Sequence, residues 1–264
     1  MRFRTCRGFS GDDNEQAFFW LSDVGWAATE PHLPKNQPGA RRVDDRRVVS
    51  GIIHVLKVGC RWCDCPPEYG PATTIYNRFN RWSRSRFWTG LVEALAGAGA
   101  ITRSTSIDST YIKAHRSAHG GKGGRKQDIS LSRGGQTSKL HALTDVLGRP
   151  SAFALTPGNV SDMKAAPALL SQLNGARYPL ADKGYDANAL RSALRRQGTV
   201  PVIPGRVNRK RTIAYDKRRY CDRHLIENAF CRIKDFRRVA TRYDKLAHNF
   251  MSAVALATLI AFWV

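Results

Sequence analysis

The chain has 264 residues, which allows one or two domains. Hydrophobic residues make up 42% of it, so a folded core is expected and a wholly disordered chain is excluded. Lys and Arg number 43 against 21 Asp and Glu, a net charge of +22, which indicates a polyanionic partner such as DNA, RNA or an anionic membrane. No secretory signal pattern is recognised near the N-terminus, and a reducing cytoplasm is the expected compartment.

The first part of the chain is predicted to be helical. Residues 1–19 show no clear periodicity and stay unassigned, whereas residues 20–97 carry apolar side chains at helical spacing. One helix in this region has Asp44 or Asp45 as its expected N-terminal cap and Gly59 just beyond its end. We therefore expect a small all-helical domain over residues 20–97.

A second helix in this domain has two possible caps, Thr73 and Thr74, and a set of arginines away from its apolar side. Helix, turn and an arginine-bearing second helix are typical of a helix-turn-helix DNA-binding unit. The interpretation assigns DNA contacts to Arg78, Arg81 and Arg84. The alternative is a helical bundle whose basic face is merely solvated.

After a Gly- and Ala-rich linker, residues 101–264 change to a mixed pattern of strands and helices. Their order resembles that of a ribonuclease H-like sheet, so the fold class is α/β with a helical N-terminal domain. The apolar C-terminal stretch 247–264 is predicted to be a buried helix, with a membrane anchor as the alternative. Strands are expected at 106–114, 138–144, 151–155, 178–181 and 200–203, helices at about 161–173, 187–197 and 222–238, and a loop at 116–136.

Two aspartates lie at strand ends in this basic chain. Asp108 is in the predicted strand 106–114, and Asp182 directly follows the strand 178–181. Side chains at strand ends can converge on one crevice, and two carboxylates brought together favour a cation between them. Mg²⁺ prefers such oxygen ligands. For each aspartate taken alone, a turn or capping role is the alternative.

The predicted helix near residue 220 adds further support for a metal-binding site. Tyr220, Arg223, Glu227 and Lys234 fall within a stripe roughly 60° wide at 100° per residue. The stripe places a carboxylate between cations and beside a phenol, which suits a metal-binding acid next to phosphate-holding groups. The alternative is a surface ion pair, because Arg223 and Glu227 are four residues apart.

At these residues the chain resembles a DDE transposase of bacterial insertion sequences, of the IS-five family. The run Tyr220, Arg223, Glu227, Lys234 matches the Y-(2)-R-(3)-E-(6)-K motif of that family at every position. The segments 107–110 and 181–186 resemble its first and second aspartate regions, and 141–145 and 155–162 resemble further parts of it. The resemblance covers about residues 20–264.

The resemblance implies that Asp108, Asp182 and Glu227 form a catalytic and metal-binding triad. Two Mg²⁺ ions, for which Mn²⁺ can substitute, would support strand cleavage at the element ends and 3′-OH strand transfer. Tyr220, Arg223 and Lys234 would contact DNA. The other carboxylates nearby, Asp145, Asp162 and Asp186, are interpreted as turn or capping residues.

The expected substrate is double-stranded DNA, both the terminal inverted repeats of the element and the target. Basic density supports this expectation, because residues 206–245 hold fourteen Lys and Arg against five acids. Pairing of two element ends implies a homo-oligomer of at least two subunits, acting on the nucleoid in the bacterial cytoplasm, with no membrane partner. The alternatives are a ribonuclease H-like nuclease without strand transfer, and a DNA-binding protein derived from an inactive transposase.

Overall fold

The computed structural model describes residues 18–34, 44–99, 103–120, 127–172 and 175–263. Its N-terminal part is helical, as predicted, and the segment 1–17 lies outside the described residues. Asp44 caps the second helix by accepting from the backbone N–H groups of Arg46 and Arg47, and Gly59 ends it with φ of 84°. The helices of this part are α1 (Asp23–Thr29), α2 (Asp45–Val58), α3 (Ala72–Arg84) and α4 (Phe87–Gly99).

The cap expected at Thr73 or Thr74 was placed wrongly. Helix α3 begins at Ala72, and Pro71 precedes it without a side-chain cap. The carbonyl of Pro71 accepts from the N–H groups of Thr74 and Ile75, so both threonines already lie within the first turn. Pro71 is the residue before the first helical residue, with φ of −58° and ψ of 128°, and it needs no N–H partner there.

The second part of the described chain contains one mixed sheet of six strands. Strand β3 pairs antiparallel with both β1 and β4, and β1 pairs parallel with β5. Short strands β2 and β6 extend the sheet at the far end of β3 and β1. The strands are β1 (Ser104–Ala114), β2 (Ser130–Ser132), β3 (Gly135–Thr144), β4 (Pro150–Pro157), β5 (Tyr178–Ala181) and β6 (Thr241–Arg242).

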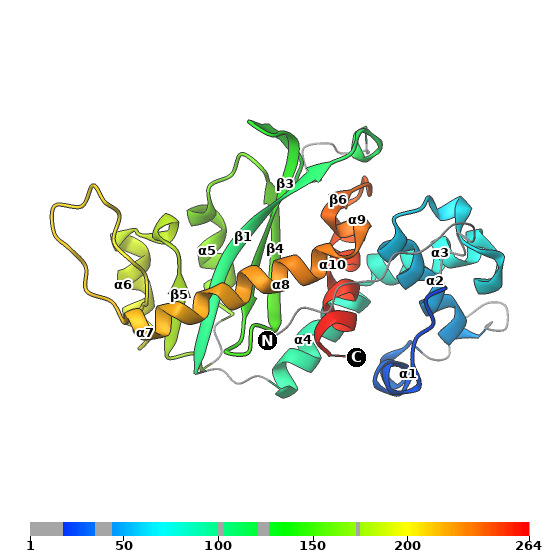
Figure 1. Ribbon diagram of the computed structural model, residues 1–264, viewed down its shortest axis with the longest axis horizontal. Helices are drawn as coiled ribbons and strands as arrows, with labels where there is room; N and C mark the ends of the chain where they lie inside the picture. Colours follow the sequence, from blue (N-terminus) through cyan, green and yellow to red (C-terminus); the bar gives the residue numbers. More distant parts are fainter. Residues whose placement is uncertain (1–17, 35–43, 100–102, 121–126, 173–174, 264) are drawn as a thin grey trace, which may run out of the picture.

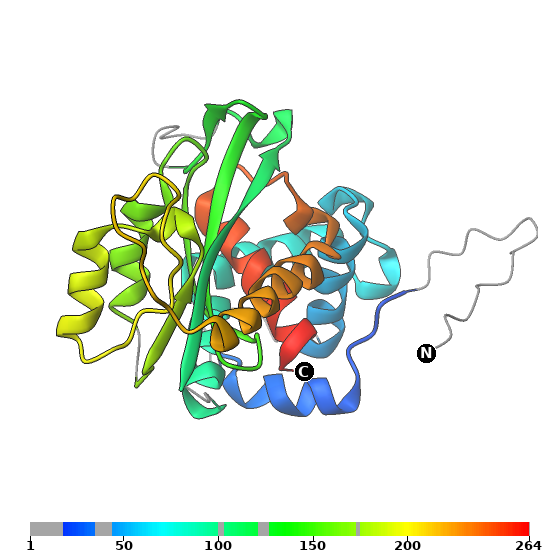
Figure 2. The ribbon, with the colours of Figure 1, turned by 60° about the vertical axis from the view of Figure 1, so that its left-hand side comes forward.

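Helices cover both faces of this sheet. Helices α5 (Asp162–Leu170) and α6 (Asn188–Arg196) lie on one face. Helices α8 (His224–Lys234), α9 (Arg237–Ala240) and α10 (Ala247–Phe262) lie on the other, together with α4. Figure 2 shows the green sheet between the yellow α6 and the orange and red C-terminal helices. The protein therefore has a layered α/β architecture with the helical part joined to one face.

The apolar core on the side of α10 is continuous between the helical part and the sheet. Helix α10 has buried side chains from Asn249 to Leu259, which confirms the predicted buried C-terminal helix. No helix in the described chain is long and apolar enough to cross a membrane. The shared core includes Ile52, Phe79 and Trp88 from the helical part, Ile112 and Leu140 from the sheet, and Val254 from α10.

Two further differences from the sequence prediction have local causes. The expected strand 200–203 forms only a single bridge, between Val202 and Leu180. Pro201 and Pro204 have no N–H to donate to a sheet, which limits pairing there. The expected helix 222–238 is divided into α8 and α9, and it is preceded by α7 (Lys217–Tyr220) and a tight turn. Within the expected loop 116–136, residues 130–132 form β2.

Candidate active site

The two predicted aspartates are brought next to each other by neighbouring parallel strands, with Asp108 within β1 and Asp182 just after β5. In the register of β1 and β5, Ile107 is the partner of Ala181, so Asp108 and Asp182 each follow one member of the same pair. Ile107 and Ala181 are both buried, which fixes the two strand backbones at this point. The convergence expected from the sequence is therefore present for these two carboxylates.

The backbone around Asp182 holds its carboxylate in place. Asp182 caps a short turn that follows β5, and its Oδ1 accepts from the N–H of Gly184 at 2.8 Å. A Cβ atom on residue 184 would lie 2.8 Å from that same oxygen. Glycine at this position thus permits the close approach that orients Asp182.

Asp108 is in an environment that opposes its ionisation. Burial raises the pKa of this carboxyl, and the nearby charge of Asp182 raises it further. The Ser109 N–H and the Arg223 guanidinium act in the opposite direction without cancelling the increase. A cation near the two aspartates would relieve this unfavourable concentration of negative charge.

Helix α8 links the third predicted acid to Asp108 indirectly, through an arginine. Arg223 donates from Nη1 to Oδ2 of Asp108 at 2.7 Å, and its Nη2 donates to Oε1 of Glu227. Side-chain exposure is 18% for Arg223 but 52% for Glu227, so the glutamate remains open to solvent. Asp108 and Glu227 are thus separated by one guanidinium group.

The far end of α8 contacts the same strand. The Nζ of Lys234 donates to Oγ1 of Thr110 at 2.6 Å and to the carbonyl of Tyr111 at 3.4 Å. Burial lowers the pKa of Lys234. Tyr220 lies near Arg223, with the guanidinium carbon 5.9 Å from the ring centroid. The stripe predicted from spacing therefore faces β1.

Among the residues that the structure describes, no three His, Cys, Asp or Glu side chains are close enough to hold a metal ion together. The arrangement nevertheless fits a divalent cation at Asp108 and Asp182, because two carboxylates supply hard oxygen ligands where excess negative charge needs a counter-ion. The Arg223 guanidinium also provides positive charge at this place, through its ion pairs with Asp108 and Glu227.

The sequence did not predict a polar network that begins at Ser109, the residue after Asp108. Ser109 Oγ donates to Oδ1 of Asp162 at 2.7 Å, and the same oxygen lies 3.1 Å from Nζ of Lys139. His141 lies 3.8 Å from it through Nδ1. The sequence interpretation gave Asp162 a turn or capping role; it is the first residue of α5, but Ser161 is the cap residue and the Asp162 side chain contacts Ser109 and Lys139 instead. Its contact with Ser109 spans 53 residues, and no local spacing signals it.

Of the other two competing carboxylates, Asp145 has the turn role interpreted from the sequence, whereas Asp186 makes buried ion pairs with residues up to 23 positions away. Asp145 accepts from the N–H groups of Leu147 and Arg149 in the turn between β3 and β4. Asp186 is buried and pairs with Arg191 and Arg209. Neither aspartate joins Asp108 and Asp182.

The predicted DNA-contacting arginines of α3 differ in their surroundings. Arg78 pairs with Asp45 at 2.5 Å and is mostly buried, whereas Arg81 and Arg84 are exposed. The ion pair of Arg78 links α3 to α2 and competes with any phosphate contact. Arg81 and Arg84 carry no such pairing in the described structure.

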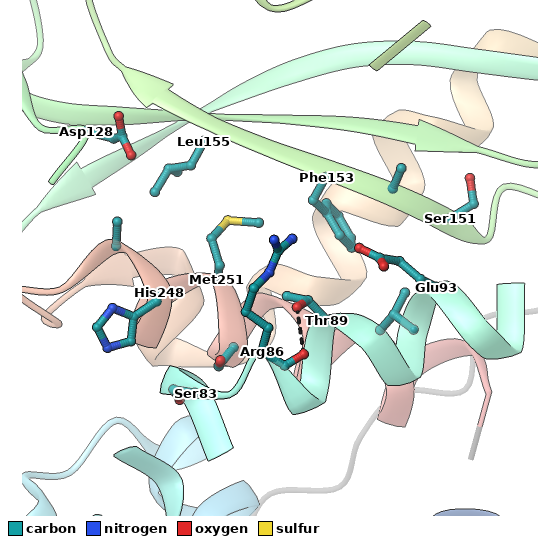
Figure 3. Close-up of a pocket in the computed structure, with 14 residues that line it drawn as sticks. Ser83, Arg86, Thr89, Glu93, Asp128, Ser151, Phe153, Leu155, His248 and Met251 are labelled. Atoms are coloured by element: carbon teal, nitrogen blue, oxygen red, sulfur yellow. Dashed lines mark hydrogen bonds between the residues drawn. The ribbon is translucent and has the colours of Figure 1, made fainter. Parts of the chain in front are cut away.

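The pocket shown in Figure 3 is separate from the predicted catalytic acids. It has a volume of about 250 Å³ and is lined by α4, β4 and the start of α10, with Arg86, Phe153 and His248 among its residues. None of the three predicted catalytic acids lines it. The candidate active site is therefore the surface where the pairing of β1 with β5 ends, at Asp108 in the middle of β1 and Asp182 just after β5, beside α8.

One of the two aspartates, Asp108, lies within its strand and not at the strand end expected from the sequence. Neighbouring carboxylates in and just after adjacent parallel strands, beside a cationic helix on a mixed sheet covered by helices, are typical of one enzyme class. Its members have a ribonuclease H-like fold and act on phosphodiester bonds with a divalent metal ion. Comparison with known proteins narrows this class. A family model described as "Transposase DDE domain" matches residues 101–262, and one described as a putative transposase of the IS4/5 family matches residues 21–92.

Two relatives have informative names. The putative transposase for insertion sequence element IS6501 of Brucella ovis is 39% identical over 125 residues, which are 46% of this chain and 94% of that protein. The putative transposase for insertion sequence element IS402 of Burkholderia cepacia is 30% identical over 137 residues, 48% of this chain and 63% of that protein.

The fold is also similar to that of a piggyBac transposase, solved by cryo-EM as a synaptic complex with hairpin DNA. The similarity has a TM-score of 0.51 at 8% identity and covers 89% of this chain and 69% of that one, which supports the ribonuclease H-like fold. The chain belongs to the DDE-domain transposases of insertion sequences. Its activity is DNA transposition, and membership of this family implies dependence on a divalent metal ion.

Proposed function

We propose that Asp108, Asp182 and Glu227 are the catalytic triad, and that they hold Mg²⁺, or Mn²⁺ in its place. The observation that carries this proposal is the pairing of Ile107 with Ala181, which puts Asp108 beside Asp182, while Arg223 ties Glu227 to Asp108. The bound metal would activate the attacking oxygen and stabilise the leaving oxygen of a phosphodiester. The reaction is cleavage at the element ends followed by attack of the freed 3′-OH on target DNA.

Arg223 has two roles in this proposal. In the structure it neutralises Asp108 and Glu227, which would otherwise repel each other across α8 and β1. When these carboxylates bind a metal ion, the guanidinium is free to donate to a DNA phosphate, for which its planar geometry is well suited. Lys234 and Tyr220 extend this phosphate-contacting line along β1.

Binding of the element ends is assigned to the helical domain 20–97, and chemistry to the domain 101–264. Arg81 and Arg84 are exposed on α3 and suit phosphate contacts. Arg78 is assigned the same role, although its ion pair with Asp45 must open first. We further propose at least a dimer with two element ends, acting at the nucleoid in the bacterial cytoplasm.

The test is incubation of the full chain with DNA carrying its own element ends and Mg²⁺, followed by mapping of the cut strands. Asp108→Asn, Asp182→Asn and Glu227→Gln should each abolish cleavage while end binding persists. Asp222→Asn is a matched control, because Asp222 is an exposed acid on the adjoining turn. Full cleavage by the Glu227→Gln variant would exclude the proposed triad.

Strand transfer is tested separately by adding target DNA and looking for joined products. Joining of the cut 3′ end to target DNA identifies a complete transposase. Cleavage without joining would indicate a nuclease, and binding without Mg²⁺-dependent cleavage would indicate an inactive derivative.

A further inference from the structure

A second groove lies on the face of the sheet that carries α5. It has a volume of about 700 Å³ and is formed by β1, the β2–β3 hairpin and the loop 158–161. Lys113, Arg133 and Lys139 line it, and none of its lining residues is acidic. Lys113 and Arg133 are exposed, whereas Lys139 is buried and paired with Asp162, so two exposed cations and no lining carboxylate favour an anionic ligand.

One exposed aromatic residue, Tyr111, lines this groove. Tyr111 is 56% exposed, whereas its neighbour on β1, Ile112, is fully buried. It lies three residues beyond Asp108 on β1, a distance of about 10 Å along the strand. Because side chains alternate along a strand, Tyr111 lies on the opposite face of β1 from Asp108 and on the same face as Ser109.

The ring of Tyr111 is supported from one side. The Nζ of Lys139 lies 4.7 Å from its centroid. Lys139 is itself buried and fixed, because its Nζ donates to the carbonyl of Val160 at 2.9 Å and pairs with Asp162 at 3.1 Å. A ring with a rigid support and more than half of its residue exposed is a preformed surface for stacking.

The opposite wall of the groove is also rigid. The N–H of Gly158 donates to the carbonyl of Thr137 at 3.2 Å, and a Cβ on residue 158 would lie 1.9 Å from Thr137 Oγ1. The N–H of Asn159 donates to Oγ of Ser130 at 3.0 Å. A groove held in this way loses little conformational entropy when it binds a ligand.

We propose that this groove binds an unpaired nucleotide of the DNA substrate, with its base stacked on Tyr111 and its phosphates beside Lys113 and Arg133. The proposal rests on the proposed DNA-cleaving function, because the end of a cut strand can fray from its complement and leave an unpaired nucleotide. In a duplex the faces of each base are covered by neighbouring bases, so an aromatic side chain can stack only on a base that has left the duplex. The volume falls within the range of pockets that enclose small ligands.

The experiment measures binding of a fluorescein-labelled ten-residue oligothymidine and of a random-sequence duplex to the full chain in EDTA. Tyr111→Leu should weaken oligothymidine binding by roughly tenfold and duplex binding far less, because one stacking contact is lost. Tyr111→Phe should bind like the wild type, since it keeps the ring. That rescue separates loss of stacking from loss of the fold.

The charge contribution has its own control. Lys113→Gln should weaken oligothymidine binding and reduce its salt dependence by about 0.7 in the log–log slope. Lys164→Gln removes the same charge from an exposed position on α5 outside the groove and should change neither value. Equal losses for both lysine variants would overturn the proposed phosphate contact.

The stacking proposal fails if Tyr111→Leu leaves oligothymidine binding unchanged or weakens both DNAs equally. Because binding is measured without metal, this result is independent of the catalytic triad. Loss of cleavage in Glu227→Gln together with unchanged oligothymidine binding in Tyr111→Leu would refute the groove and leave the proposed function intact.

Discussion

The Asp186 side chain, next to the active site, is predicted to contribute strongly to the stability of the folded state. Asp186 follows the turn that Asp182 caps, and its side chain is completely buried. Four donors reach its two oxygens, including Nε of Arg191 at 2.8 Å, the N–H of Arg206 at 2.8 Å and both Nε and Nη2 of Arg209. Arg191 is only 3% exposed. Removing the charge of Asp186 therefore leaves a buried guanidinium without its counter-charge.

We expect Asp186→Asn to lower the free energy of unfolding by about 3 to 5 kcal/mol, the usual cost of breaking a buried ion pair from one side. The measurement is urea unfolding at pH 7. The control is Asp64→Asn, which removes an acid whose pair with Arg61 is exposed and which should change stability little. An Asp186→Asn variant that is no less stable than the control would refute the reasoning.

The same ion pairs predict that the stability of the folded state depends on pH. Burial opposes ionisation of Asp186, but hydrogen bonds from Arg209, Arg206 and Arg191 outweigh it and hold the pKa well below its usual range. The folded state therefore binds the proton less readily than the unfolded chain, whose carboxyl has a pKa near 4. The stability advantage of the wild type over Asp186→Asn should be complete above about pH 5 and should fall as the pH drops below 4.

Three other perturbations have defined outcomes. Asp44→Ala removes the cap of α2 and should cost about 1 kcal/mol of stability in urea unfolding, whereas Asp44→Ser should restore most of it. Gly158→Ala places a Cβ against Thr137 and should lower the melting temperature, and combining it with Thr137→Ala should recover part of the loss if that clash is the cause. Burial lowers the pKa of His141 to about 4, so protonation favours the unfolded chain between its ordinary pKa and that value. Wild-type stability should fall by about 2 kcal/mol more than that of His141→Gln between pH 7 and pH 5, and equal slopes would contradict the buried neutral imidazole.

Much of the local structure follows from the sequence. The strand predicted at 178–181 has the same bounds as β5, and Asp44 and Gly59 begin and end their helix as expected. These features depend on short-range chemistry: a short run of apolar residues, a capping side chain and a glycine with positive φ. Thr73 and Thr74 were misjudged as caps because the neighbouring Pro71 determines where α3 begins.

The contacts that shape the candidate site depend on distant residues. Spacing alone predicted that Arg223 and Glu227 share one face of a helix. It did not predict that Arg223 also reaches Asp108, 115 residues away in the chain. The contact of Ser109 with Asp162 likewise forms only when α5 packs on the sheet. Such pairings require the strand register and the helix position together, and neither is fixed by a local pattern.

The position of Arg223 connects the fold with the expected chemistry. One guanidinium balances two of the three proposed metal ligands, so Asp108 and Glu227 can be held together without a metal ion. Glu227 is the more exposed of the two and lies on a helix, so it can change partner without moving the sheet. Asp108 and Asp182 are fixed by paired strands and do not have that freedom. We infer that the two strand aspartates form the rigid part of the site, and that α8 supplies the adjustable part, with Arg223 and Glu227 exchanging contacts when metal and DNA bind.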